Sequence, residues 1–263
     1  GAATSAGDGA GHVLVSLGSG EPVRLPSPCL PRPPPGAFVD LPQLRRLSAA
    51  IAQDLAVGHD CVLAGPPGCG KSALARRLAA LLGYGAPGGS GIEFFFLYEE
   101  MSSRDLLQRR TTDAGGRTSW VDSPLVRAAR SGAVCILDGM HRLRGDVLCA
   151  LAPLLQDRQA SLSVANDPLG AEAELLLRQD RYEALRHRLS DAGSYDEQSN
   201  CRVARIHPSF RVLALAELPT ARAPWLTEEL STCFSHHAYP ELEPGDVVRV
   251  LASLFPRLQE AAA

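Results

Sequence analysis

Hydrophobic residues in this chain follow two alternating patterns: short runs that are almost entirely apolar, and longer segments where apolar residues recur every three or four positions. The short runs are residues 61–64, 92–97, 133–137 and 211–216, interrupted only by Glu93 and begun in the last case by Arg211. The segments with helical spacing are residues 41–56, 72–82, 123–130 and 146–155. Buried strands that alternate with helices predict a parallel sheet covered on both faces. We therefore expect an α/β fold with a five-stranded, mostly parallel sheet.

The flanking segments have a different composition. Residues 12–16 and 21–25 bracket a Gly-Ser-Gly turn and predict a small hairpin, which a proline-rich passage at 26–35 separates from the main domain. A polar insertion is expected around residues 157–205, and the last segment, 244–263, predicts one helix. The expected division is residues 1–35 as linker and small hairpin, 36–240 as the α/β domain, and 241–263 as the start of an incomplete helical lid.

Composition narrows the functional classes. The 263 residues are 45% hydrophobic, enough for a sizeable core, and the net charge of −3 gives no general attraction to nucleic acid or anionic membranes. No apolar run approaches the length of a membrane span. The seven cysteines form no C-x-x-C pair, and Cys61 and Cys135 fall in expected buried strands, as free thiols of a reducing compartment do. Because the sequence begins with glycine, any targeting peptide lies outside it, and we take the chain as a segment of a longer protein.

The sequence Gly-Pro-Pro-Gly-Cys-Gly-Lys-Ser at residues 65–72 carries the most specific signal. It matches the phosphate-loop pattern G-x-x-x-x-G-K-[ST] and lies between an expected strand and an expected helix. Backbone N–H groups of such a loop and the helix N-terminus bind phosphate, the lysine reaches the β- and γ-phosphates, and the hydroxyl ligates Mg²⁺. The residues expected to bind nucleotide are Gly65, Pro66, Pro67, Gly68, Cys69, Gly70, Lys71, Ser72 and Ala73.

A phosphate loop needs a carboxylate to orient the magnesium ion. Asp138 ends the apolar run Val-Cys-Ile-Leu and is the expected Walker B aspartate on a strand neighbouring the loop. Ser72 and Asp138 are thus the expected Mg²⁺ ligands. The alternative is a strand-end aspartate that only makes a turn.

Several segments resemble a known family. Residues 120–132, Trp-Val-Asp-Ser-Pro-Leu-Val-Arg-Ala-Ala-Arg-Ser-Gly, run into the strand before Asp138 and resemble dynein-related AAA+ ATPases of the MoxR and midasin type. Further similar segments are residues 98–110, 137–142, 180–182 and 206–217. The resemblance implies an ATP-binding module of a larger multi-module ATPase, with sibling modules in a ring or tandem array and a protein substrate. It also implies a mitochondrial location.

Three positions depart from the pattern of an active family member. Gly139 stands where a glutamate that polarises the attacking water follows the Walker B aspartate, and Glu217 stands where the polar sensor, usually Asn, is expected. Cys233 stands where the arginine finger is expected. Losing a general base costs about 10²–10⁴-fold in rate, and an arginine finger is worth about 10³–10⁵-fold. The sequence therefore predicts retained binding with slow hydrolysis.

Glu217 has two interpretations. Its carboxylate would hold the attacking water in place of the missing glutamate, or it would only pair with a nearby arginine. Neighbouring residues on a strand face opposite sides, so one metal ion does not take both His236 and His237.

Three functions remain open from sequence. The module hydrolyses ATP slowly, or it binds nucleotide as a structural or regulatory clamp without turnover. The third is a small-molecule phosphotransferase, since the loop sequence also suits nucleotide kinases. We expect ATP rather than GTP because the resembling family uses it and no N-K-x-D guanine signature is present.

Overall fold

A computed structural model gives the fold of the chain. The structure describes residues 11–15, 23–27, 38–85, 91–112, 116, 118–164, 173–190, 195–196, 200–220 and 225–255. Parts of the expected linker, the proline-rich passage, the glycine-rich loop at 85–91 and the end of the expected last helix lie outside these residues.

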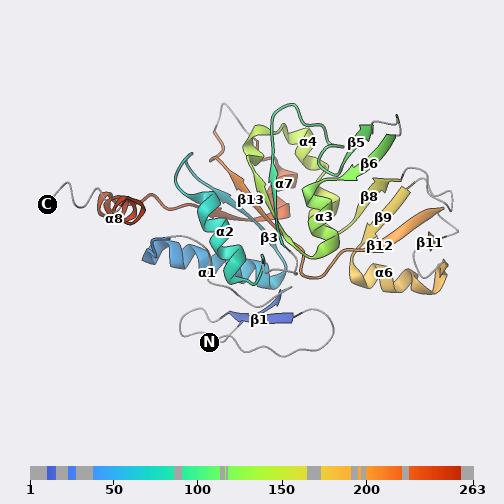
Figure 1. Cartoon of the computed structure of the whole chain (residues 1–263), viewed down its shortest axis with the longest axis horizontal. Coiled ribbons are helices and arrows are strands. Elements are labelled where there is room, and N and C mark those ends of the chain that lie inside the picture. The colour runs from blue at the N-terminus through green and yellow to red at the C-terminus, as the bar shows by residue number, and fades with distance from the viewer. Residues whose placement is uncertain are drawn as a thin grey trace.

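The centre of the molecule is a five-stranded sheet in which every neighbouring pair is parallel (Figure 1). Its strand order is β14-β3-β13-β7-β4. The bounds are β3 Asp60–Ala64, β4 Ile92–Phe96, β7 Val134–Asp138, β13 Arg211–Ala216 and β14 Phe234–Ala238. The expectation of a five-stranded parallel sheet is confirmed. All strands end on the same edge, which places their C-terminal residues together.

Side chains of the central strands alternate between two cores. On β13, which is buried along its whole length, Leu213 and Leu215 face one core while Val212 and Ala214 face the other. Helices α1 (Pro42–Val57) and α2 (Lys71–Leu81) cover the first face, and α3 (Pro124–Ser131) covers the second with α7 (Glu228–Cys233). Figure 1 shows α1 and α2 on one side of the sheet and α3 and α7 on the other. The apolar residues of one strand thus supply both cores, as the short apolar runs predicted.

Local signals determine where the helices begin and end. A proline lies in the first turn of α1, and Gly58 ends that helix with φ +98°, a left-handed conformation that glycine adopts without a Cβ clash. Ser123 caps α3 by accepting a hydrogen bond from the Val126 N–H. These ends agree with the expected helices to within one or two residues.

The expected single helix at 146–155 is wrong, because the chain forms two short helices there. They are α4 (Gly145–Cys149) and α5 (Ala152–Gln156), which follow the 3₁₀ turn η1 (Met140–Arg142). Pro153 is tolerated only in the first turn of a helix, so a new helix begins just before it. Helix α8 covers Pro244–Leu254 within the expected last helix.

The polar insertion contains a second sheet that the sequence analysis did not anticipate. Its strands are β8 (Ala160–Ser163), β9 (Ala173–Leu177), β10 (Leu189–Ser190), β11 (Tyr195–Asp196) and β12 (Cys201–Arg205), in the order β10-β11-β12-β9-β8. Helix α6 (Gln179–Leu185) and the 3₁₀ turn η2 (Arg186–Arg188) lie between β9 and β10. This sheet lies at the opposite end of the molecule from α8 (Figure 1).

Two hairpins complete the described chain. Strands β1 (Gly11–Val15) and β2 (Val23–Ser27) pair antiparallel, which confirms the small N-terminal hairpin. Strands β5 (Gln108–Thr112) and β6 (Thr118–Asp122) pair antiparallel beside the second sheet. The side chain of Gln108 joins the two by accepting from the Ser163 N–H at 2.7 Å and donating to the Ser163 carbonyl at 3.3 Å.

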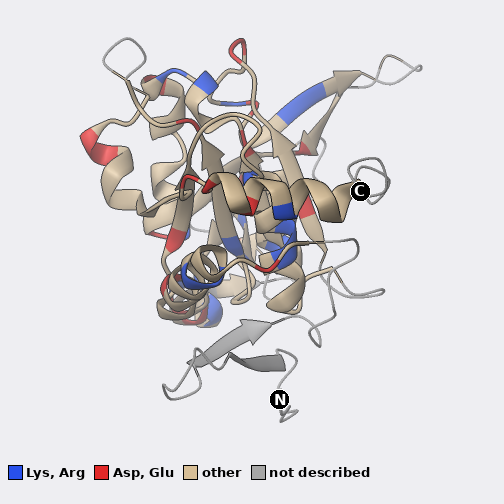
Figure 2. Cartoon of the chain, turned by 90° about the vertical axis from the view of Figure 1, so that its left-hand side faces the viewer, with Lys and Arg blue, Asp and Glu red and all other residues tan. Residues whose placement is uncertain are grey.

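Charged residues of both signs are interspersed over the described elements (Figure 2). The described part of the chain has no helix with the length and apolar character needed to cross a bilayer. Neither observation assigns a partner by itself.

Candidate nucleotide-binding site

The phosphate-loop residues form a tight turn between β3 and α2. Gly68 and Gly70 have φ of +74° and +105°, in the left-handed region that favours glycine, and α2 begins at the next residue, Lys71. The N–H groups at the start of a helix have no partner within the helix, and its dipole favours an anion there. The loop and helix therefore have the geometry expected of a phosphate cradle.

Tyr239 supports this loop from behind. A Cβ atom at Gly65 would lie 2.8 Å from the Tyr239 Cβ, and one at Gly70 would lie 3.0 Å from the phenol oxygen. The Tyr239 N–H also donates to the Ala64 carbonyl at 2.7 Å, which fixes the tyrosine where β3 ends. Burial raises the pKa of Tyr239 to about 12, so the phenol stays neutral against the loop. The glycines at 65 and 70 are thus required by close packing as well as by the loop's shape.

The Lys71 ammonium lies over the loop. Its Nζ donates to the Gly65 carbonyl at 2.8 Å and to the Pro66 carbonyl at 2.6 Å. Both acceptors are neutral, and among the described residues Lys71 makes no hydrogen bond to a carboxylate, so its positive charge stays available at the mouth of the cradle. A polyphosphate is the kind of ligand that such a charge attracts.

Ser72 and Asp138 meet across the sheet. The Ser72 hydroxyl donates to the Asp138 Oδ2 at 3.1 Å. The sequence predicted that Asp138 would lie on the strand next to the loop strand, and this is wrong. Strand β13 pairs with both β3 and β7 and therefore separates them. The small Ala216 on β13, at the same edge, leaves the two oxygen groups within reach of each other. A hydroxyl and a carboxylate are hard oxygen donors of the kind Mg²⁺ takes.

Gly139 occupies a left-handed position directly after Asp138. Its φ is +93°, and a Cβ atom there would lie 3.1 Å from the Leu97 carbonyl oxygen and 3.2 Å from the Arg142 Cδ. An L-residue at this position would be strained by its backbone and crowded by its neighbours. The local backbone therefore favours glycine at position 139 over glutamate or any other residue with a Cβ atom.

Among the described residues, the Glu217 carboxylate is paired with a histidine and with no arginine. His141, on η1, lies with its Nε2 atom 3.3 Å from Glu217 Oε1, and its Nδ1 accepts the Glu217 N–H at 3.1 Å. Because Nδ1 is the acceptor, the neutral ring carries its proton on Nε2 and donates it toward the carboxylate. Desolvation and the nearby positive charges lower the pKa of His141, whereas Glu217 acts in the opposite direction.

His141 is a site residue that the sequence reasoning missed. It lies three positions after Asp138, but the signal that joins it to Glu217 is the pairing of β13 with β7, which a linear pattern does not carry. Trp225 further holds the Glu217 backbone by donating its indole N–H to the Glu217 carbonyl at 3.0 Å.

These groups line one hollow of about 320 Å³ at the C-terminal edge of the sheet. Its lining residues are Pro67, Gly68, Gly70, Lys71, Ser72, Ala73, Asp138, His141, Arg142, Leu215, Ala216 and Glu217. Of the predicted site residues, Gly65, Pro66 and Cys69 belong to the loop but do not line this hollow. Pro66 and Cys69 instead line an apolar hollow of about 630 Å³ between the loop and α8.

Cys233 lies at the end of α7 and is buried. Its thiol donates to the Glu229 carbonyl at 3.2 Å, and burial raises its pKa. The position aligned with the arginine finger therefore holds an uncharged, inward-facing group, and it presents no cation to a neighbouring molecule.

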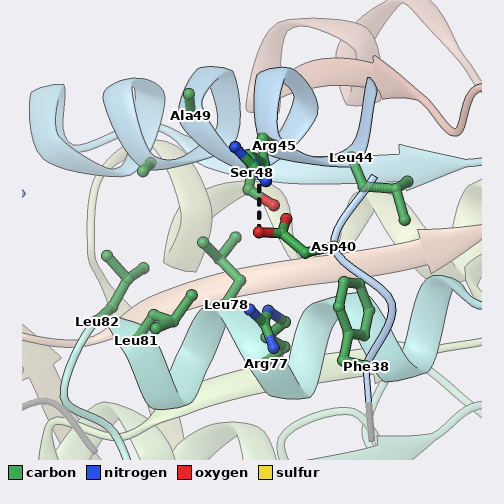
Figure 3. A pocket seen from close by; sticks show the side chains of 11 residues that line it. Phe38, Asp40, Leu44, Arg45, Ser48, Ala49, Arg77, Leu78, Leu81 and Leu82 are labelled. Carbon is green, nitrogen blue, oxygen red and sulfur yellow. Dashed lines mark ion pairs between the residues drawn. The ribbon is translucent and has the colours of Figure 1, made fainter. Parts of the chain in front are cut away.

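A further hollow of about 260 Å³ lies between α1 and α2 (Figure 3). Leucines from both helices line it, Arg45 pairs with Asp40 at 2.9 Å, and Arg77 stacks on the Phe38 ring at 4.5 Å. Its cations are already partnered, and it contains no loop of consecutive backbone donors. It is therefore separate from the phosphate cradle.

The fold and the cradle together define a P-loop nucleotide-binding protein. A family-level comparison matches residues 60–234 to the AAA domain (dynein-related subfamily). The chain belongs to this family, which is a family of ATPases. The match begins at the start of the loop strand β3 and ends at the start of β14.

Curated relatives agree with this assignment. The chain is 35% identical to von Willebrand factor A domain-containing protein 8 of Mus musculus, over 95% of this chain and 13% of that protein. It is 40% identical to Protein NorQ of Paracoccus denitrificans over 42% of this chain and 37% of NorQ. It is 31% identical to Midasin of Giardia intestinalis over 46% of this chain and 2% of midasin. The chain thus spans only a small part of its longest relatives.

Proposed function

We propose that this chain is a Mg-ATP-binding module of a larger AAA+ ATPase. The observation that carries the proposal is the meeting of Lys71, Ser72 and Asp138 at one edge of the sheet, beside a loop of backbone donors. Lys71 would bind the β- and γ-phosphates, Ser72 would ligate Mg²⁺, and Asp138 would orient the ion and its waters. The two glycines with positive φ let the loop backbone face the phosphates.

The nucleoside would occupy the apolar hollow between the phosphate loop and α8. That hollow adjoins the cradle through Gly68, and Tyr239, Leu242 and Val250 supply much of its apolar wall. A planar base buries its faces well against such side chains. Binding there would bridge the sheet domain and the first helix of the lid.

Turnover by this module would be slow. Gly139 supplies no carboxylate to polarise water, which costs about 10²–10⁴-fold where a positioned base is lost. Cys233 is buried and uncharged, so a neighbouring module's site would lack a cation worth about 10³–10⁵-fold. The lack of both groups favours a module that binds nucleotide as a structural or regulatory clamp without turnover. Ligand at a hundredfold excess over its dissociation constant stabilises the folded state by about 2.7 kcal/mol, enough to bias assembly.

The His141–Glu217 pair favours residual hydrolysis as a second candidate. Glu217 lies in the same hollow as Lys71 and Asp138, and its carboxylate is held by the ring of His141. Glu217 would accept a proton from the attacking water, while His141 would fix the direction of the carboxylate. Lys71 and Arg142 in the same hollow would offset the added negative charge.

Calorimetry with Mg-ATP on the purified chain tests binding. Wild type should bind with one site, and Lys71→Ala should lose most of the affinity while keeping its melting temperature without ligand. No heat from Mg-ATP, with a melting temperature that ignores every nucleotide offered, would overturn the proposal.

Single-turnover hydrolysis tests the second candidate. If Glu217 is the base, Glu217→Gln should abolish the residual rate without changing Mg-ATP affinity, and His141→Asn should lower it. An unchanged hydrolysis rate in Glu217→Gln would rule out Glu217 as the base and favour the nucleotide-binding clamp.

The relatives favour a multi-module setting. In that setting, sibling AAA+ modules in a ring or tandem array would be the partners, and a protein would be the substrate. Turnover of the full-length protein that hardly responds to Lys71→Ala would indicate that the hydrolysing sites are in other modules. A screen of small phosphate acceptors would detect the less favoured phosphotransferase activity.

A further inference from the structure

Three side chains with metal-binding atoms gather away from the phosphate loop. Asp54 lies near the end of α1, Cys61 on β3 and His237 on β14. One carboxylate oxygen, one thiol sulfur and one ring nitrogen all lie within 4.8 Å of one another. The three residues come from three different elements, so tertiary packing alone brings them together.

The strand register explains the arrangement. Cys61 pairs with Ser235 and Leu63 pairs with His237, so Cys61 and His237 are diagonal neighbours on the sheet face that α1 covers. Asp54 approaches this face from α1. His236 faces the other way, and its ring lies 3.2 Å from the Ser231 carbonyl. Only one of the two adjacent histidines therefore joins the cluster, as the alternation of a strand predicts.

The contacts that these three side chains make with one another and with nearby carbonyls could be exchanged for bonds to a metal ion. His237 Nε2 lies 2.8 Å from Asp54 Oδ2, which fixes the ring toward the carboxylate. The Cys61 side chain is fully buried, and its thiol lies at the long distance of 3.9 Å from the Ile51 carbonyl and from the His59 carbonyl. Ligands of a four-coordinate zinc ion are about 2.0–2.3 Å from the metal. Small side-chain rotations would bring these three atoms to such distances.

We propose that Asp54, Cys61 and His237 form a Zn²⁺ site. Sulfur, imidazole nitrogen and carboxylate oxygen are the three donor types that zinc takes, and three protein ligands leave the fourth tetrahedral position to water. The Asp54 side chain is 33% exposed, which gives solvent access to that position. On binding, the Cys61 thiol loses its proton to solvent and its sulfur bonds to the metal, so zinc uptake releases one proton and needs no oxidant or reductant.

Such a site would act on the nucleotide cradle through Tyr239. Zinc would join α1 to β14 two residues before Tyr239, whose side chain packs on Gly65 and Gly70. Fixing β14 would hold this tyrosine against the loop. The zinc site itself does not depend on the proposed nucleotide binding, and its test uses no nucleotide.

The first experiment titrates metal-free protein with Zn²⁺ and with Co²⁺. Wild type should bind one Zn²⁺ with a rise in melting temperature. Co²⁺ should give a thiolate-to-cobalt charge-transfer band in the near ultraviolet and the intense visible bands of four-coordinate cobalt. The near-ultraviolet band requires a thiolate ligand, so binding at Ser72 and Asp138 would not produce it.

Matched variants locate the site. Cys61→Ala should abolish the charge-transfer band, whereas Cys135→Ala, which removes an equally buried thiol from β7, should keep it. His237→Gln should weaken Zn²⁺ binding at least tenfold, whereas His236→Gln should not. Circular dichroism on each metal-free variant establishes that it is folded. Absence of the band and of the thermal shift in wild type would overturn the proposal, and so would their survival in a folded Cys61→Ala or His237→Gln.

Discussion

Ser72 and Asp138 are 66 positions apart in the sequence, yet the Ser72 hydroxyl donates to the Asp138 carboxylate at 3.1 Å. Ser72 lies in the first turn of α2, directly after the phosphate loop, and Asp138 ends β7. Strand β13 lies between β3, which leads into the loop, and β7, so the contact depends on parallel strands that end along one edge. The proposed magnesium site is a consequence of that topology.

Asp138→Asn should remove the magnesium dependence of nucleotide binding. A hydrogen bond to a charged group is worth about 1.5–3 kcal/mol, so affinity for ATP with Mg²⁺ should fall roughly 10–100-fold. Affinity measured in EDTA should change little, because the phosphate contacts of the loop remain. Calorimetry with and without Mg²⁺ measures both. Asp157→Asn, at an exposed residue that pairs with Arg181, is the control, and an equal loss in both buffers would contradict the assigned role.

Gly139→Ala should destabilise the fold by about 1–2 kcal/mol from its left-handed backbone, and further from its contact with the Leu97 carbonyl. Gly58→Ala is a matched comparison, because its φ is +98° but a Cβ there has nothing within 4 Å. Gly91→Ala has neither burden and should be neutral. Urea unfolding should therefore rank the losses as Gly139, then Gly58, then Gly91. A Gly139→Ala variant as stable as Gly91→Ala would contradict this account.

Gly139→Glu tests whether restoring the missing glutamate is enough to restore ATP hydrolysis. The carboxylate would arrive on a strained backbone beside Arg142, so we expect lower stability and no gain in turnover. A large rise in steady-state ATP hydrolysis would show instead that the missing glutamate is the sole reason for slow turnover.

The main sheet and the phosphate loop could be predicted because their signals are local. Strands β3, β7 and β13 are dominated by apolar residues, and the loop pattern includes its own strand and helix context. The second sheet was missed because its strands are short and lie in a mostly polar segment. Strand β12 alternates buried Cys201 and Val203 with more exposed residues, and it pairs with β9 across a long segment. The His141–Glu217 pair was missed for a similar reason, since it depends on which strands are neighbours. Residues joined only through tertiary pairing leave no linear pattern.

Arg158→Met should cost about 3–5 kcal/mol, because it leaves the buried Asp60 carboxylate without its cationic partner. Asp60 is 1% exposed in its side chain and is held by Arg158 through two hydrogen bonds of 2.6 and 2.9 Å. The double variant Asp60→Asn with Arg158→Met should recover part of the loss, since the uncompensated charge is gone. Thermal and urea unfolding of wild type, the two single variants and the double variant measure the coupling energy between Asp60 and Arg158.

The control is Arg181→Met, which breaks the exposed pair with Asp157 and should cost at most about 1 kcal/mol. Equal losses in the two arginine variants would contradict a buried-charge origin.

Stability should decline as the pH rises above 10, and Tyr84 should account for part of the decline. Its hydroxyl donates to the Ser209 carbonyl at 2.6 Å, and burial raises its pKa to about 12. In the unfolded chain the phenol ionises near pH 10, whereas in the folded chain it stays neutral until about pH 12. The free energy of unfolding therefore falls by about 1.4 kcal/mol for each pH unit in this window, and the full contribution of Tyr84 to stability is present only below pH 10.

The variant Tyr84→Phe lacks the hydrogen bond to Ser209 and should lose about 1 kcal/mol of stability at pH 7, but its stability should fall less steeply between pH 10 and 12. Urea unfolding at intervals across this range, with reductant to keep the thiols reduced, gives both slopes. Parallel curves for wild type and Tyr84→Phe would show that other groups, such as Tyr239, carry the alkaline loss.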